Sequence, residues 1–324
     1  MPSGHPKVLV IIGRGRSGST ILDNILGEID GFFSAGELHN LWKRGLIRGH
    51  TCGCGQPIAS CALWRSVLEV ASTKLTVTPS AGDVVRWQEQ MVTPRQTRGL
   101  LKETKHGEDG SELRAYAALL DSVYAAISEV TGARVIIDSS KRPAHAALLR
   151  LLPHSSPYFV QMVRDPRAVS YSRTRVKSDV DERQMKRGSS FRSAVKWLQR
   201  NREAEADRRS HPSEASLVIR YEDFIAEPRL AVESIVNLVG ENPECLPISR
   251  ERQVSLGQNH TAAGNPSRFR RGVVKLREDN EWLVKQKALD RLVTTAVALP
   301  LLKRYGYRVR LEQPASHRPL LSDE

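Results

Sequence analysis

Short apolar runs and longer amphipathic stretches alternate along this chain. The apolar runs have the length of β-strands and are rich in β-branched residues: Lys7–Ile12, Arg134–Ile137, Tyr158–Val163 and Leu217–Ile219. Because consecutive positions in each run are apolar, both faces of these strands are expected to be buried. This is typical of a parallel sheet that is covered on both sides.

Helical periodicity appears between the runs. Residues 21–29 and 113–130 each carry apolar side chains along one face of a helix. Leu230–Val239 ends at Gly240, a helix stop signal, and a last helix at Trp282–Leu299 is expected to end at Pro300. Strands that alternate with helices predict an α/β fold, a three-layer sandwich in which helices flank a central parallel sheet.

The pattern also predicts a single domain. No internal repeat, long linker or low-complexity tract interrupts residues 1–311, and residues 312–324 are expected to form a polar, flexible tail. The N-terminal apolar run, Val8–Ile12, is too short for a signal-peptide core or a membrane span. With 40% hydrophobic residues the chain can fill a sizeable core, and we expect a soluble, cytoplasmic protein.

Polar residues follow each predicted strand at its carboxyl end. They are residues 13–20 after the first strand, Glu37 after a short run at Phe32–Gly36, and residues 138–141, 164–167 and 220–223 after the others. Ligands of parallel α/β sheets bind at this edge. The five strand ends together therefore predict the functional site.

Residues 13–20 have the form of an anion-binding loop. Glycines let backbone N–H groups turn inward, and the start of the following helix adds a positive dipole, so the expected fold is P-loop-like. The loop has the pattern G-x-x-x-x-G-S-T, with Ser19 where nucleotide triphosphatases carry the lysine that reaches the β and γ phosphates. Arg16 supplies positive charge from another place in the loop. An ordinary structural turn is the alternative interpretation.

The run Arg16-Ser17-Gly18-Ser19-Thr20 resembles the 5′-phosphosulfate loop of sulfotransferases that use 3′-phosphoadenosine 5′-phosphosulfate. That family also holds the 3′-phosphate with an Arg and a Ser eight residues apart, and Arg164 and Ser172 have this spacing here. The resemblance implies that this compound is the donor, that adenosine 3′,5′-bisphosphate is the product, and that no metal is required. It also implies a set of donor-binding loop residues: Arg14, Gly15, Arg16, Ser17, Gly18, Ser19 and Thr20.

Two further stretches are similar to the family. Tyr221, within Arg220-Tyr221-Glu222-Asp223-Phe224, stands where the family places a tyrosine near the adenine. Arg270-Arg271-Gly272 resembles the late basic loop that closes over the 3′-phosphate, although this segment departs from the best-known soluble version. The similarity extends from residue 8 to about residue 285, nearly the whole chain.

Sulfuryl transfer needs a base for the acceptor proton and positive charge on the leaving oxygen. Glu37, 21 residues after Arg16, stands where the carbohydrate and tyrosylprotein-like branch carries a catalytic glutamate, and His39 is the nearby rival. Lys141 follows a strand where related enzymes use a lysine on the bridging or sulfuryl oxygens, and Arg16 completes the implied catalytic set. The alternatives are a helix-capping carboxylate for Glu37 and a surface lysine for Lys141.

Charge indicates an anionic partner. The chain has 49 Lys and Arg against 36 Asp and Glu, a formal charge of +13, and residues 141–220 hold 18 basic and 8 acidic side chains, +10 of that total. A phosphorylated small molecule, an anionic membrane, a nucleic acid or merely a solvated basic face each fits this excess.

Four cysteines are too few for a disulfide framework. Cys52, Cys54 and Cys61 form C-x-C-x6-C, which with His50 or His106 could bind zinc. Because the spacing is not a paired-hook pattern, a reduced, structural cysteine-rich turn is the favoured interpretation, and no metal ligand is assigned.

The sequence thus predicts transfer of a sulfuryl group to a hydroxyl of a small-molecule, carbohydrate, lipid or tyrosine-like acceptor. An anionic or membrane-associated acceptor and the oligomeric state both stay open, and the acceptor pocket is expected from loops at residues 40–112 and 175–190. A P-loop kinase that uses ATP and Mg²⁺ is the first alternative, against which the missing lysine argues. A non-catalytic nucleic-acid-binding protein is the second, although the 6% aromatic content and the lack of a groove-reading motif make nucleic acid an unexpected partner.

Overall fold

The computed structural model describes residues 5–92, 111–174, 189–210 and 215–309. The chain divides into two units, of which the first comprises Met1–Arg164 with Gln199–Glu278 and the second Asp165–Leu198 with Asp279–Glu324. The expectation of one domain over residues 1–311 stays a prediction, and the tail at 312–324 lies outside the described residues. Each unit is taken by itself below.

Five parallel strands form the centre of the first unit. They lie in the order β2 (Phe32–Gly36), β3 (Val135–Asp138), β1 (Lys7–Gly13), β4 (Ser156–Val163) and β5 (Ser216–Arg220). These bounds agree with the apolar runs to within two residues. The predicted α/β fold with a central parallel sheet is confirmed, and the carboxyl ends of all five strands meet at one edge.

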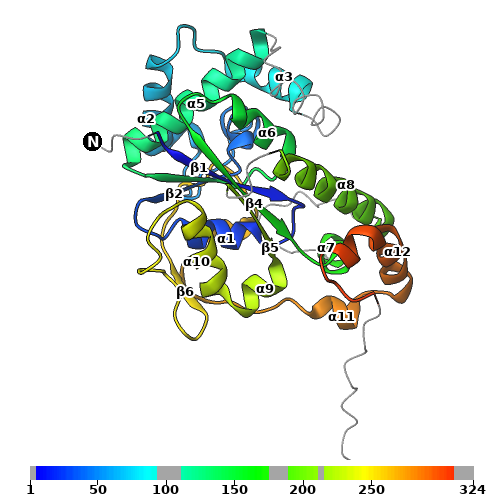
Figure 1. Ribbon diagram of the computed structural model, residues 1–324. Helices are drawn as coiled ribbons and strands as arrows, with labels where there is room; N and C mark the ends of the chain where they lie inside the picture. The colour runs from blue at the N-terminus through cyan, green and yellow to red at the C-terminus, as the bar shows by residue number, and fades with distance from the viewer. Residues whose placement is uncertain (1–4, 93–110, 175–188, 211–214, 310–324) are drawn as a thin grey trace, which may run out of the picture. The chain divides into compact units, whose positions relative to one another are not determined.

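Alternate residues of β1 enter two separate cores, because successive side chains of a strand point to opposite faces. Val8, Val10 and Ile12 pack on one face, whereas Leu9 and Ile11 pack on the other. The first face is covered by α2 (Ala62–Thr73), α3 (Ala81–Met91), α5 (Ser111–Thr131) and α6 (Pro143–Leu148), and the second by α1 (Ser19–Leu26), α9 (Tyr221–Ala226) and α10 (Pro228–Leu238). Figure 1 shows the resulting three layers, with α5 above the sheet and α1 and α10 below it.

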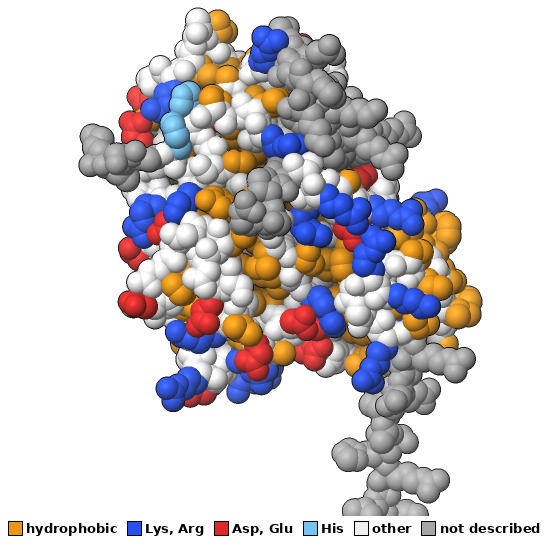
Figure 2. All heavy atoms as spheres, viewed as in Figure 1, with side chains coloured by type: hydrophobic (Ala, Val, Ile, Leu, Met, Phe, Trp, Pro, Cys, Tyr) orange, Lys and Arg blue, Asp and Glu red, His pale blue; other side chains and the backbone are white. Residues whose placement is uncertain are grey.

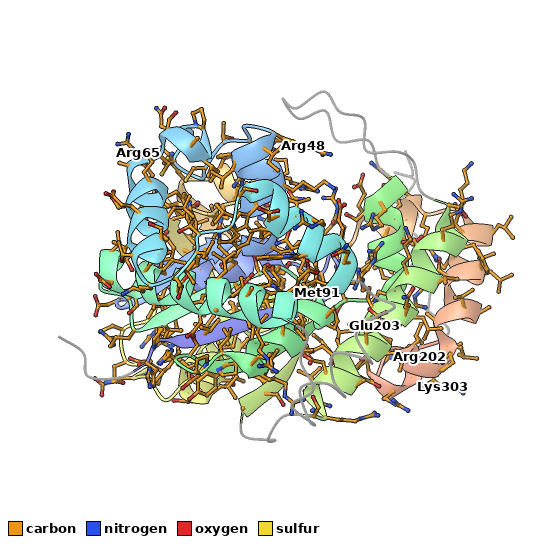
Figure 3. The ribbon with its side chains drawn as sticks, turned by 90° about the horizontal axis from the view of Figure 1, so that it is seen from above. Arg48, Arg65, Met91, Arg202, Glu203 and Lys303 are labelled. Carbon is orange, nitrogen blue, oxygen red and sulfur yellow. The ribbon has the colours of Figure 1, made fainter. Side chains whose placement is uncertain are left out.

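The stretch 40–112, which we expected to be loop, is partly helical, and in this respect the prediction is wrong. It contains η2 (Leu41–Ile47), η3 (Ile58–Ser60), α2 and α3, and a short turn η1 (Leu38–Asn40) precedes them, while residues 93–110 lie outside the described part of the chain. Trp64, Val67 and Ala71 give α2 a buried face, and Ser80 caps α3 through a reciprocal capping box with Asp83. Figure 3 shows Arg48 and Arg65, both exposed, at the outer edge of this layer.

A small antiparallel hairpin completes the first unit. Its strands are β6 (Gln253–Leu256) and β7 (Gly272–Lys275), and the turn η6 (Pro266–Phe269) lies in the segment that joins them. The turn η4 (Leu149–Leu151) follows α6. Over α10 and β6, the surface in Figure 2 carries acidic and basic side chains intermixed. The basic excess of the chain is therefore not displayed on that part of the surface.

The second unit is built around α7 (Pro166–Thr174), which packs against α11 (Glu281–Lys285) and α12 (Ala288–Arg304). The helix α8 (Ser190–Arg208) belongs to both units. The prediction of one helix ending at Pro300 is wrong, since two helices occupy the segment and Pro300 lies inside α12. Burial of Leu301 and Leu302 outweighs the one backbone hydrogen bond that a proline forfeits. Within the described ranges, no helix combines the length and apolar character needed to cross a bilayer.

Candidate active site

The loop after β1 has the backbone of an anion cradle. Gly13 has φ 125°, and a Cβ there would lie 2.5 Å from the Met162 carbonyl oxygen, so the close approach of β4 requires glycine. Arg16 has φ 80° and Gly18 φ 83°, with Ser17 between them at negative φ. This alternation turns successive N–H groups toward one side, as in anion-binding nests. The alternation requires Arg16 to adopt a left-handed backbone conformation that non-glycine residues avoid. Backbone strain of this kind concentrates at functional sites.

Ser17 lies at the bottom of the cradle. Its side chain is fully buried, and its hydroxyl has no hydrogen-bond partner among the described residues. The helix α1 begins two residues later at Ser19, and the N–H groups of a first helical turn have no partner within the helix. An anion at this helix start would satisfy both the hydroxyl and those donors. The half-buried Arg14, Gly15 and Thr20 complete the loop.

Arg164 and Tyr221, two residues selected by resemblance, lie directly beside the cradle. A Cβ on Gly18 would approach the Tyr221 ring to 2.5 Å, so ring and loop are in contact. The Arg164 guanidinium lies 4.2 Å from the centroid of that ring, and its Nη1 donates to the Arg16 carbonyl oxygen at 3.3 Å. Both side chains are buried. The ends of β4 and β5 therefore place a cation next to the loop.

Glu37 and Lys141 form an ion pair at the same edge. The Lys141 Nζ donates to Glu37 Oε1 at 2.7 Å and to the Ser139 carbonyl oxygen at 3.0 Å, while Glu37 Oε2 accepts from Asn40 at 2.7 Å. The Lys141 backbone N–H donates to Ile11 of β1 at 3.2 Å, which places this residue beside the strand that leads into the cradle. Burial is the largest single influence and raises the pKa of Glu37, but the charge and hydrogen bond of Lys141, together with the Arg44 charge and the Asn40 hydrogen bond, hold the pKa below its ordinary value. Glu37 is thus an ionised carboxylate at neutral pH.

Asp23, in α1, connects the cradle to this pair, and the sequence reasoning missed it. Its two carboxylate oxygens accept from the Ser34 hydroxyl at 2.6 Å and the Ser139 hydroxyl at 2.7 Å. Burial raises the pKa of Asp23 to about 6, against the two hydrogen bonds and the Lys141 charge. An aspartate inside the apolar pattern of residues 21–29 was the available signal, because an unpaired carboxylate is rarely buried.

His39, the rival base, lies in a buried polar cluster with Ser140 and His145. Its backbone N–H donates to the Ser140 hydroxyl at 3.0 Å, and its ring lies 5.9 Å from that of His145, which contacts the Asp138 carboxylate at 2.9 Å. Burial and then the Arg142 charge hold the pKa of His39 well below its ordinary value. The local geometry favours Glu37 over His39 as the base, because the Glu37 carboxylate contacts Lys141.

The other predicted donor residues belong to other elements. Ser172 is buried on α7, in the second unit. Arg270 and Arg271 are exposed, and Gly272 begins β7 with φ 79°; the turn η6, which directly precedes them, packs against α1. Their roles toward a donor stay predictions.

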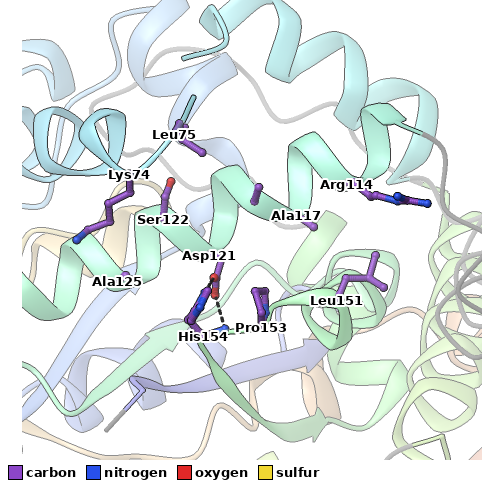
Figure 4. A pocket seen from close by; sticks show the side chains of 11 residues that line it. Lys74, Leu75, Arg114, Ala117, Asp121, Ser122, Ala125, Leu151, Pro153 and His154 are labelled. Atoms are coloured by element: carbon purple, nitrogen blue, oxygen red, sulfur yellow. Dashed lines mark hydrogen bonds and ion pairs between the residues drawn. The ribbon is translucent and has the colours of Figure 1, made fainter. Parts of the chain in front are cut away.

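A pocket of about 650 Å³ lies away from this edge (Figure 4). Its lining includes Asp121 on α5 and His154, whose ring nitrogen Nδ1 lies 2.7 Å from the Asp121 carboxylate. His154 directly precedes β4, so the pocket lies at the amino ends of the strands. Since ligands of parallel sheets bind at the carboxyl ends, this pocket is not the candidate site.

The three cysteines selected by their spacing converge with a histidine distant in sequence. Cys52, Cys54, Cys61 and His260 place their potential ligand atoms within 4.8 Å of one another. His50 is not part of this group, and His106 lies outside the described residues, so the two histidines considered from the sequence are replaced by His260.

This chain is similar to known proteins in sequence and in fold. A family model described as the sulfotransferase family matches residues 6–243. The sulfotransferase domain of the Synechococcus PCC 7002 olefin synthase has a similar structure, with TM-score 0.50, 20% identity, and coverage of 93% of this chain and 96% of that domain. A sulfotransferase domain from the curacin biosynthetic pathway follows with TM-score 0.48, 16% identity, and coverage of 95% and 100%. No curated protein sequence matches the chain. The likeness to the olefin synthase domain supports the fold, and the match of the family model over most of the chain shows that this protein belongs to the sulfotransferase family.

Proposed function

We propose that this sulfotransferase takes its sulfuryl group from 3′-phosphoadenosine 5′-phosphosulfate and transfers it to an acceptor hydroxyl, with Glu37 as general base. The observation that carries the proposal is the position of the Glu37–Lys141 ion pair. It lies at the sheet edge that also carries the 13–20 loop, with Lys141 hydrogen-bonded to β1 two residues before that loop. A base and a cation beside an anion cradle are what in-line sulfuryl transfer requires.

The loop residues fit the 5′-phosphosulfate. The buried Ser17 hydroxyl lacks a hydrogen-bond partner among the described residues, and the start of α1 adds N–H donors. Arg164 fits the 3′-phosphate, because a planar guanidinium binds phosphate through two parallel hydrogen bonds. Tyr221 is assigned to the adenine, and Ser172, Arg270, Arg271 and Gly272 to the 3′-phosphate, on the sequence resemblance alone. The bound donor supplies the sulfuryl group and departs as adenosine 3′,5′-bisphosphate.

Glu37 and Lys141 divide the remaining chemistry between them. The Glu37 carboxylate accepts the proton of the acceptor hydroxyl, for which it must be ionised, and its lowered pKa ensures this at neutral pH. Lys141 donates hydrogen bonds to the oxygen on which negative charge develops. The Lys141 ammonium contacts Glu37 in the structure. Rotation of the Lys141 side chain toward the donor would leave the Glu37 carboxylate available to accept the acceptor proton.

The charges around Glu37 favour an acceptor with an anionic group near its hydroxyl. Arg44 lies close enough to lower the pKa of Glu37, and the Glu37 charge in turn acts on the half-buried Arg142. Two guanidinium groups and an ammonium near Glu37 offer cations to an acidic group of the acceptor. A carbohydrate, lipid or tyrosine-like hydroxyl next to an acidic group is therefore the first class to screen.

Calorimetric titration with adenosine 3′,5′-bisphosphate, in parallel with ATP plus Mg²⁺ at the same salt concentration, tests the donor assignment. We expect metal-independent binding of the bisphosphate that Arg164→Ala abolishes. Arg86→Ala, which changes an exposed arginine of α3, serves as the matched control and should bind normally. Preference for ATP with Mg²⁺ would favour the kinase alternative, and binding of neither ligand would contradict the proposal.

A further inference from the structure

Cys52, Cys54, Cys61 and His260 form a cluster outside the candidate active site. Cys52 and Cys61 are buried, Cys54 and His260 are half-buried, and all three cysteines are free thiols. The four side chains come from two segments that lie 199 residues apart at Cys61 and His260. Folding thus brings together a set of soft ligands that nothing in the proposed chemistry uses.

Three of the six distances between ligand atoms in the cluster match the edges of a zinc tetrahedron. Tetrahedral zinc with Zn–S near 2.3 Å and Zn–N near 2.0 Å requires S···S edges of about 3.8 Å and S···N edges of about 3.5 Å. The Cys54 and Cys61 sulfurs lie 3.8 Å apart, and His260 Nδ1 lies 3.7 Å from the Cys52 sulfur and 3.4 Å from the Cys61 sulfur. All four ligand atoms lie within 4.8 Å of one another.

We infer that this cluster binds one Zn²⁺ ion as a closed, structural Cys3His site. Three thiolates and one imidazole in tetrahedral arrangement select zinc over hard cations, which prefer oxygen. Four protein ligands leave no open position for a water or substrate, which distinguishes a structural site from a catalytic one.

Contacts around the cluster orient the segments that carry the ligands. The Gly53 N–H donates to the Thr261 carbonyl oxygen at 3.0 Å, and the Trp64 indole donates to the His260 carbonyl oxygen at 2.7 Å. A Cβ on Gly53 would lie 1.8 Å from the Asn259 amide oxygen, so only glycine fits between the two ligating cysteines. Such supporting contacts are typical of metal sites.

The site is coupled to the proposed catalytic base through the backbone. From His260 the chain continues along the end of β2, where the Ala262 N–H donates to the Ala35 carbonyl oxygen and the Glu37 N–H donates to the Ala263 carbonyl oxygen, both at 2.9 Å. Zinc would fix residues 259–263 to the 52–61 segment and thereby hold the backbone of Glu37. The ion is a positioning element for Glu37 and takes no part in the reaction.

Metal analysis of untagged protein, purified without chelator and under reducing conditions, tests the site. We expect stoichiometric zinc in the wild type, little zinc in Cys54→Ser and His260→Ala, and full zinc in Cys245→Ser, whose cysteine is exposed and lies outside the cluster. Wild-type protein grown with cobalt should show the absorption bands of tetrahedral thiolate-bound Co²⁺, a result that does not depend on whether the variants fold. Zinc-free wild type, stoichiometric iron, or a Cys54–Cys61 disulfide found by mass spectrometry would each overturn the inference.

Hydrogen exchange tests the positioning role separately. Chelation of the zinc should speed amide exchange at residues 35–37 and 259–263, while the affinity for adenosine 3′,5′-bisphosphate stays within about twofold, because the donor cradle lies on other elements. Unchanged exchange at residues 35–37 would refute the coupling to Glu37. Zinc content and exchange do not depend on sulfuryl transfer, so failure of the proposed function would leave both results interpretable.

Discussion

Gly18→Ala should weaken both the fold and donor binding through one contact. Gly18 has φ 83°, and the added Cβ would meet Tyr221 Cδ2 at 2.5 Å and Cε2 at 2.9 Å. Alanine in the left-handed region costs about 1–2 kcal/mol. Overpacking against a rigid buried ring costs about a further 1–3 kcal/mol. The two costs sum to about 2–5 kcal/mol. The reduced entropy of the unfolded chain offsets about 0.4–1 kcal/mol, so we expect the free energy of unfolding to fall by about 1–4.6 kcal/mol.

Gly132→Ala separates the two contributions. Gly132 also has positive φ, 72°, but a Cβ there would meet nothing within 4 Å. The control variant therefore bears the backbone cost without the clash, and the two variants should differ by about 1–3 kcal/mol in urea unfolding. If Gly18→Ala costs no more than Gly132→Ala, the contact between loop and ring is not what the structure indicates.

Binding gives the second readout for Gly18→Ala. Displacement of the Tyr221 ring also displaces Arg164, whose guanidinium lies 4.2 Å from its centroid. Loss of one well-placed contact to a phosphate is expected to reduce the affinity for adenosine 3′,5′-bisphosphate at least about tenfold, or about 1.4 kcal/mol. Calorimetry should show this loss in Gly18→Ala and normal affinity in Gly132→Ala. Equal affinities would refute the placement of Arg164 at the donor phosphate.

Three further predictions concern the carboxylates at the sheet edge. Glu37→Gln should lower turnover about 10²–10⁴-fold while the bisphosphate affinity measured by calorimetry changes little, and near-normal turnover would exclude Glu37 as the base. Because the pKa of Glu37 is held below its ordinary value, wild-type turnover should fall only below that value as pH decreases. In Lys141→Met only the Arg44 charge and the Asn40 hydrogen bond still oppose burial, so the acid limb of the pH–rate profile should move to higher pH; an unmoved limb would contradict the pairing. The pKa of Asp23 is raised from 3.8 to about 6, so its contribution to stability is present below about pH 4 and is lost as pH rises through about 6. The unfolding free energy of Asp23→Asn minus that of the wild type should therefore rise by about 3 kcal/mol from pH 4 to pH 8. Urea unfolding of both proteins at the two pH values measures this change, and a difference that is the same at pH 4 and pH 8 would contradict the raised pKa of Asp23.

Much of the fold and of the donor loop could be predicted from local patterns. Consecutive apolar residues such as Val8–Ile12 marked the buried strands, because only a strand covered on both faces is apolar at every position. The glycines and hydroxyl residues of the loop at 13–20 predicted an anion cradle, since its backbone conformation depends on residue type at each position. The helices α2 and α3 were missed where the pattern was less regular.

Contacts between distant segments could not be predicted in this way. No spacing rule joins Cys61 to His260, and the histidines nearest in sequence were the wrong ones to consider. Asp23 likewise acquires its role only when β2 and β3 bring Ser34 and Ser139 to its carboxylate.

The sequence by itself determined the parallel α/β sheet and the chemical character of each strand end, because strand burial, loop conformation and charge are properties of neighbouring residues. Only the tertiary structure decided which of those strand ends meet. Glu37 and Lys141 lie 104 residues apart, yet the adjacency of β2, β3 and β1 brings their charged atoms to 2.7 Å. Electrostatic interaction depends on distance in space and not on distance along the chain. The proximity that the fold creates therefore places a cation beside the Glu37 carboxylate and lowers its pKa.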